Sequence, residues 1–151
     1  MHPSKSVISG DGDTDPGTPT GALAEFYRAF NGRDLALMRA NWHPEECVLD
    51  NPLGGIRRGW DEIEPLYASV FEGAARVRVV FFDYTLHLGR DLFCAAGRER
   101  GQLKRDGLSL ELAIRTSRLY RRLEGRWCQV HHHGSIEDPG LLQQYRSAVL
   151  A

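Results

Sequence analysis

The sequence predicts an α+β domain in which helices cover one face of a strongly curved antiparallel sheet. Two observations lead to this fold class. Apolar residues recur at helical spacing through the first half of the chain, whereas from residue 75 onward the pattern becomes that of long strands joined by short turns. Because helices and strands are segregated along the chain, a parallel α/β sheet is disfavoured. A curved sheet backed by helices forms a cone, whose mouth is a natural ligand pocket.

Bulk composition restricts the function classes. A length of 151 residues suggests one domain, and the formal net charge of −1 gives no basic field that would favour nucleic acid or a membrane surface. No apolar run approaches the roughly 20 residues of a spanning helix, and the N-terminus lacks the apolar core of a signal peptide. We therefore expect a cytoplasmic protein whose three cysteines stay reduced.

Three regions follow one another along the chain. Residues 1–17 are polar and rich in Gly, Asp and Ser, which is typical of a flexible arm. The folded domain is expected over residues 18–137. A C-terminal helix, which opens at Asp138-Pro139, is expected over residues 138–151.

The helices are predicted by spacing and by their start signals. The first has apolar side chains at i, i+3, i+4 and i+7, namely Leu23, Phe26, Tyr27 and Phe30. A second helix follows its capping residue Asp34. The third, near residues 60–72, is expected to start around Asp61 or Glu62, because Pro65 is tolerated only in a first turn.

Segments rich in β-branched and aromatic residues are expected to form the sheet. After a short strand in ECVLDNP and a loop in LGGIRRG, four such segments should pair as consecutive antiparallel strands, at residues 76–88, 90–103, 108–122 and 126–136. The Asp106-Gly107 and Glu124-Gly125 pairs supply two of the connecting turns.

The segment GRWCQVHHHGS contains three consecutive histidines. On a strand, alternation turns His131 and His133 to one face and His132 to the other, so one metal ion cannot bind all three. No other Cys or His shows complementary spacing. We therefore expect neither a metal nor another cofactor.

Two stretches resemble a known superfamily. The stretch LAEFYRAFNGRDLALMRANWHPEECVLDNPLGGIRRGWDEIEPLYASVF resembles the opening of nuclear transport factor 2-like proteins, which include SnoaL-like polyketide cyclases and ketosteroid isomerases. The stretch SRLYRRLEGRWCQVHHHGS resembles the association domain of calcium/calmodulin-dependent protein kinase II and its bacterial relatives. The resemblance covers about residues 20–136. It implies a cystatin-like cone, with three N-terminal helices on a bent sheet that pairs into dimers through its outer face, but it does not imply one function.

The strand at residues 108–122 offers the first pocket residues. Its more apolar side, which should face the helices and the pocket, carries Leu110, Leu112, Ile114, Thr116, Arg118 and Tyr120. Arg118 matches a pocket arginine of the kinase association domains. A second such arginine matches Gly134, and a third falls near Arg98 or Arg100. We take Arg98 as the candidate.

The last strand supplies the opposing wall. The same alternation places Val130, His132 and Gly134 in the pocket, with Asn51 near its mouth. It places Trp127, His131 and His133 outside, beside Leu119. A buried guanidinium needs an anionic partner. For Arg118, this partner is either a ligand acid or an internal carboxylate, with Glu99 or Glu111 as candidates if the alternation shifts by one residue.

An enzymatic function is the main alternative. By resemblance to ketosteroid isomerases, the general base falls on Asn51, and an amide cannot act as a base. Asp50 is one step earlier and should face away. The helix tyrosine of that family falls on Phe26, with Tyr27 adjacent. Proton transfer by His132, with Asp50 as a second catalytic candidate, remains chemically open.

The residues together predict a small-molecule-binding homodimer. Its pocket would contain Arg118, Tyr120, His132, Asn51 and Arg98, and its ligand would be a small organic acid. The alternatives are a lyase, isomerase or cyclase acting on a hydrophobic carbonyl compound, and a module that only oligomerises. The dimer is expected to form through the outer sheet face.

Overall fold

The structure of the chain, a computed structural model, describes residues 1–150. Along this range the elements are α1 (Pro19–Asn31), α2 (Leu35–Asn41), β1 (Val48–Asp50), β2 (Arg57–Arg58), α3 (Trp60–Glu72), β3 (Arg76–Leu88), β4 (Leu92–Arg105), β5 (Leu108–Leu123), β6 (Arg126–Ser135) and α4 (Pro139–Leu150). No helix in this range is long and apolar enough to cross a bilayer.

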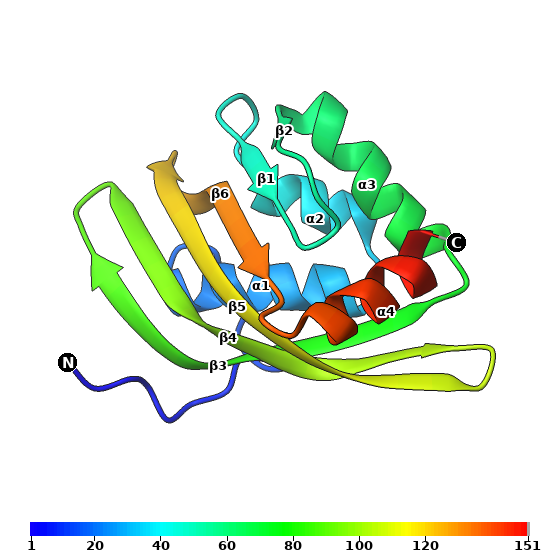
Figure 1. The fold of residues 1–151 in the computed structure, drawn as a ribbon. Coiled ribbons are helices and arrows are strands. Elements are labelled where there is room, and N and C mark those ends of the chain that lie inside the picture. Colours follow the sequence, from blue (N-terminus) through cyan, green and yellow to red (C-terminus); the bar gives the residue numbers. More distant parts are fainter. Residues whose placement is uncertain (151) are drawn as a thin grey trace.

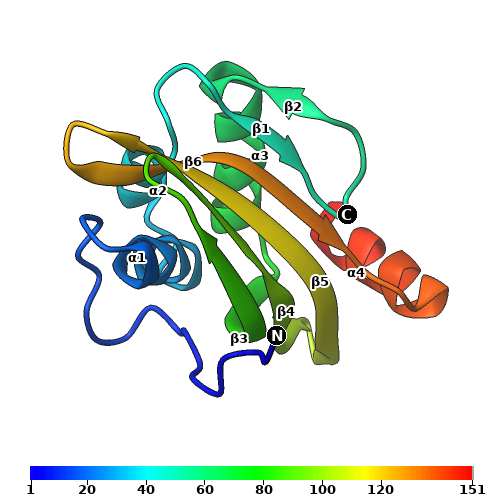
Figure 2. The same cartoon turned by 90° about the vertical axis from the view of Figure 1, so that its left-hand side faces the viewer.

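The elements form a curved sheet with helices in its concavity, which confirms the predicted fold class. The strand order is β2-β1-β6-β5-β4-β3. Figure 1 shows α1, α2 and α3 on the concave side, and Figure 2 shows β3 to β6 sweeping around them. The four long strands pair antiparallel in succession, as expected, while the short β1 runs parallel to β6.

Local sequence signals account for most helix boundaries. The Thr18 side chain accepts from the Gly21 backbone amide, and the Asp34 side chain accepts from the Leu37 amide, so both cap their helices. Helix α3 differs from the expectation because it begins at Trp60, and Pro65 therefore lies beyond the first turn. Pro65 has no N–H to bond the carbonyl four residues earlier, so the helix lacks one backbone hydrogen bond at this exposed position.

A β-bulge in β6 corrects one expected orientation. Leu119 pairs with His131, but the next residue of β5, Tyr120, pairs with Gln129, so Val130 is the extra residue. The bulge shifts the alternation by one, and Trp127 consequently faces inward. It is 4% exposed and makes an edge contact with Phe93, with ring centroids 5.0 Å apart. The prediction that Trp127 belongs to the outer face was therefore wrong.

Residues 1–17, whose composition suggested a flexible arm, lie along β3 and α1. Ile8 is buried and exchanges two backbone hydrogen bonds with Phe81, so it extends the sheet edge beyond β3. The Arg28 side chain donates to the Gly10 and Gly12 carbonyls. The arm thus covers a strand edge that would otherwise be open to pairing.

Helix α4 follows β6 at one end of the sheet (Figure 2). Its Tyr145 and Ala148 side chains are buried. The last residue of the expected helix, residue 151, lies outside the described residues.

Candidate functional site

A small cavity lies between the concave face of the sheet and the helices. Its volume is about 50 Å³. Most of its lining is apolar or aromatic and comes from α1, α3, α4 and the strands. Its strongly polar side chains are Asn51, Glu99, Arg118 and His132. An apolar space with a few convergent polar groups is the usual form of a small-molecule site.

Arg118 lies at the polar end of the cavity and is completely buried. Its Nη2 donates to Glu99 Oε1 at 2.8 Å, its Nη1 to Gln129 Oε1 at 2.7 Å, and its Nε to the Tyr27 hydroxyl at 3.3 Å. The guanidinium also lies over the Phe26 ring, 3.6 Å from the centroid. These contacts hold the cation rigidly, and three of its five N–H groups are used by protein partners.

The counter-ion of Arg118 is therefore Glu99, an internal carboxylate. Glu99 pairs with Ile114, which faces the cavity, so Glu99 faces the cavity too. Arg98 and Arg100 then point to the opposite face, where Arg98 is bound to Asp83 at 3.2 Å. The prediction that Arg98 lies in the pocket was wrong. It assigned the even-numbered residues of β4 to the pocket face, whereas the odd-numbered residues lie there.

Glu99 was expected as the partner of Arg118 only if the alternation shifted by one residue, although the sequence contains a signal for its place in the pocket. On β4, the residues that are buried and apolar are Phe93, Ala95 and Leu103, all at odd positions. Strict alternation from any of them reaches Glu99. The Tyr27 hydroxyl donates to the same Glu99 oxygen at 2.7 Å. Burial raises the pKa of Tyr27 well above its usual value; the positive charge of Arg118 offsets this in part and Glu99 adds to it, so the phenol stays protonated.

Behind Arg118, a buried polar network runs away from the cavity. Gln129 donates to Asn41 Oδ1 at 3.3 Å, and the Tyr120 hydroxyl donates to the same oxygen at 3.1 Å. The Asn41 amide donates to Glu25 Oε1, which also accepts from Arg126. Tyr120 faces inward as expected, but it lies in this network, stacked on Phe93, and does not line the cavity.

His132 lines the cavity beside Arg118, its cross-strand neighbour, as the alternation predicted. Its Nε2 lies 2.9 Å from the Thr116 hydroxyl. When that hydroxyl donates its single proton to the His133 carbonyl, 3.1 Å away, it accepts from Nε2–H. Nδ1 is then an unprotonated acceptor, and it is buried without a hydrogen-bond partner among residues 1–150.

The environment keeps His132 neutral. Burial first, and then the positive charge of Arg118, hold the pKa of His132 well below its usual value. Gly134 leaves the space that the ring needs, because a Cβ there would lie 3.3 Å from His132 Nε2 and from Pro52 Cδ. An arginine at this position, as the association-domain pattern has it, would meet both groups.

The remaining candidates divide between the two faces of the sheet. Asn51 lines the cavity, and its side-chain oxygen accepts from the Leu53 amide. Asp50 points outward as expected, with an oxygen 2.7 Å from His133 Nδ1 and another 3.6 Å from His131 Nε2. Asp50 and His132 therefore do not share a site.

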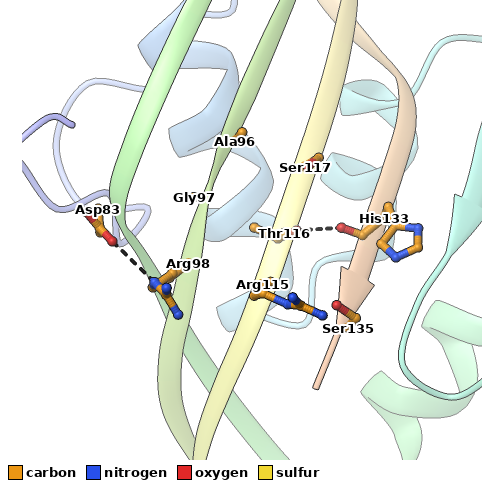
Figure 3. Close-up of a pocket in the computed structure, with 9 residues that line it drawn as sticks. All are labelled: Asp83, Ala96, Gly97, Arg98, Arg115, Thr116, Ser117, His133 and Ser135. Atoms are coloured by element: carbon orange, nitrogen blue, oxygen red, sulfur yellow. Dashed lines mark hydrogen bonds and ion pairs between the residues drawn. The ribbon is translucent and has the colours of Figure 1, made fainter. Parts of the chain in front are cut away.

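The outer sheet face has a wider hollow of about 500 Å³. Figure 3 shows its lining, with Arg98 beside Asp83 and the Arg115 side chain extending toward Ser135. Arg115 is bound to Glu137 at 3.0 Å. Because these charges are about half exposed and already paired, the hollow offers weaker recognition than the inner cavity.

The described residues contain no cluster of three or more His, Cys, Asp or Glu side chains that could hold a metal ion. Cys47, Cys94 and Cys128 are free thiols. Burial raises the pKa of each, so they are poor nucleophiles at neutral pH.

Residues 21–139 match the family model of the SnoaL-like domain. A candidate calcium/calmodulin-dependent protein kinase type II association domain from Thiobacillus denitrificans is 26% identical, with a TM-score of 0.69 over 80% of this chain and 96% of that one. A candidate dehydratase of the NTF2-like family from Streptomyces avermitilis is 17% identical, with a TM-score of 0.69 over 76% and 91% of the chains. A ketosteroid isomerase-like protein from Erwinia carotovora is 22% identical, with a TM-score of 0.65 over 78% and 92%. No curated protein sequence matches significantly.

Proposed function

Because this chain belongs to the SnoaL-like domain family, whose fold encloses a cavity here, we propose that it binds a small, mostly apolar molecule at His132. The observation that supports this function best is the Nδ1 atom of His132, a buried acceptor without a partner among the described residues. An unsatisfied buried acceptor costs about 1–3 kcal/mol, and a ligand that donates to it recovers this free energy.

The preferred ligand is neutral and carries an O–H or N–H group. A small organic acid was the first expectation, since Arg118 needs an anion. Glu99 already supplies that charge at 2.8 Å, so a second carboxylate would be buried without its own counter-ion. A neutral hydroxyl can donate to the acceptor on His132. It can also accept from the two N–H groups of Arg118 that are not bound to its three protein partners.

Binding fits the site better than catalysis of a proton transfer. An efficient general base has a pKa near the working pH. The pKa of His132 lies well below its usual value, because of burial and Arg118, so His132 is a weak base. Asp50 lies on the other face and cannot orient it.

Three probes of similar shape test the proposal: p-cresol, toluene and benzoate. In calorimetric titrations, p-cresol should bind more tightly than toluene, which lacks a donor, and than benzoate, which is charged. His132→Leu should weaken p-cresol binding about tenfold, the value of one buried hydrogen bond, and leave toluene unchanged. His133→Leu, on the same strand but the outer face, is the matched control. Equal binding of p-cresol to the wild type and His132→Leu would exclude this site.

The proposal includes a twofold dimer through the outer sheet face. The similarity to a candidate association domain supports self-association. The face carries small or half-buried residues at its centre, which allow close approach: Cys94, Ala96, Ser117 and Leu119. The hollow beside them, between Arg98 and Arg115, is space that a partner's side chains would fill.

A further inference from the structure

Helix α4 stands apart from the rest of the domain. The segment that matches the SnoaL-like family ends at residue 139, and α4 begins at Pro139. The sheet and the first three helices thus form the cone without it. Yet Tyr145, from the middle of α4, is one wall of the cavity. An element outside the matched domain therefore closes the site.

The attachment of α4 is narrow. Only Tyr145 and Ala148 are buried. Leu141, Leu142 and Val149 pack half-buried against the core, and the other described side chains of the helix are exposed. At its start, the Leu141 amide donates to Asp138 Oδ1 at 2.8 Å, and near its end Arg105 donates to the Ala148 carbonyl at 2.7 Å. Elements with few buried contacts open at low free-energy cost.

Tyr145 itself is held by packing. It is 7% exposed, and its hydroxyl makes no hydrogen bond to any residue in the described range. Burial, and then the negative charge of Glu99, raise the pKa of Tyr145, so the phenol stays neutral. The Tyr145 side chain lines the same cavity as Glu99 and His132, and it has the features of the ligand proposed above, namely an apolar ring with one O–H donor.

The cavity, as the structure has it, is too small for such a ligand. Its volume is about 50 Å³. An apolar cavity of about 150 Å³ is needed for a molecule the size of benzene. One wall must therefore move before a ring can enter, and Tyr145 lies on a helix that has only two buried residues in the described range.

We propose that α4 is a lid, and that Tyr145 occupies the inner part of the ligand site until a ligand displaces it. Tyr145 then sets the size of the molecule that the cone accepts. This inference rests on the proposed binding function. It adds a residue that determines specificity and a movement of the helix that accompanies binding.

Variants of the full chain test the lid with p-cresol as the probe. Removing the ring by Tyr145→Ala leaves a ready-made space, so p-cresol should bind at least tenfold more tightly than to the wild type. Gln144→Ala, at the exposed neighbouring position, should bind as the wild type does. Tyr145→Phe keeps the plug and should also resemble the wild type.

Hydrogen exchange of the wild type tests the movement without any substitution. Saturating p-cresol should speed exchange of the α4 amides and leave those of α1 unchanged. If the wild type binds p-cresol but Tyr145→Ala binds no more tightly and α4 exchange does not change, the lid is wrong while the binding function stands. If neither protein binds any of the three probes, both proposals fail.

Discussion

Arg118 and Glu99 are both buried, so removing either charge leaves the other without a counter-ion in the core. Arg118→Met should therefore lower the free energy of unfolding by about 3–5 kcal/mol, measured in urea. Arg115→Met, on the same strand but exposed, should change it by less than about 1 kcal/mol.

The double variant Arg118→Met/Glu99→Gln separates the effect of the unpaired charge on stability from the effect of the altered packing. The introduced amide would keep an acceptor for Tyr27 and carry no charge, so the double variant should be more stable than Arg118→Met alone. A double variant no more stable than the single one would show that the pair acts through packing. Arg118→Ala would also leave Glu99 without its counter-ion and disturb the fold, so it is an unsuitable probe of ligand binding.

His132 should make stability depend on pH. Its pKa is lowered in the folded state by burial and by Arg118, so below pH ~6.5, the usual histidine pKa, the unfolded chain binds a proton that the folded chain does not. Stability should then fall on acidification, by up to about 1.4 kcal/mol per pH unit, until the folded pKa is reached. At pH 7 and above this contribution is constant.

Urea unfolding at pH 7.0, 6.0 and 5.5 measures this dependence. His132→Gln should flatten the fall, and His133→Gln, on the exposed outer side, should leave the His132 contribution in place. A wild type and a His132→Gln variant with parallel pH profiles would contradict the depressed pKa.

At the scale of elements, the N-terminal arm completes the sheet edge. Ile8 is 9% exposed, whereas its neighbour Val7 is 49% exposed. Ile8→Ala should cost about 2 kcal/mol of stability, the lower end for a buried isoleucine, and Val7→Ala should cost little. Thermal unfolding of both variants measures the difference. Equal effects would mean that the arm is detached from β3 in solution.

The β4 strand and the β6 bulge show how elements position the site. Gly101 allows β4 to approach β3, because a Cβ there would lie 1.9 Å from the Arg78 carbonyl oxygen. The bulge at Val130 turns Gln129 inward to reach Arg118 while keeping His132 in the cavity. The bulge thus places a polar side chain where a regular strand would not.

At the scale of the whole molecule, we expect a dimer at micromolar concentration, measured by sedimentation equilibrium. Ser117→Arg places a bulky charge at the centre of the outer face and should give monomers. Ser109→Arg, on the same strand but at its exposed start, should remain dimeric. A monomeric wild type, or a dimer insensitive to Ser117→Arg, would assign the interface elsewhere.

The sequence alone determined the fold class and the orientation of β5. The alternation from Leu110 to Tyr120 is uninterrupted, so it correctly turned Arg118 toward the helices and set it beside His132. Such periodicity is a reliable guide to orientation because one whole face of the strand is buried. A shift of one residue would turn all of these apolar side chains toward solvent. The resemblance to a known superfamily agreed with it.

Only the tertiary structure decided which groups meet in the cavity. The bulge at Val130 has no mark in the local pattern, because one extra residue bends the strand and increases its twist without requiring a particular side chain there. The alternation of β4 favours Glu99 over Arg98, but the meeting of Glu99 with Arg118 depends on the register of β4 against β5. Tyr145 reaches the site from a helix far beyond Glu99 in the chain, through packing that no local spacing encodes.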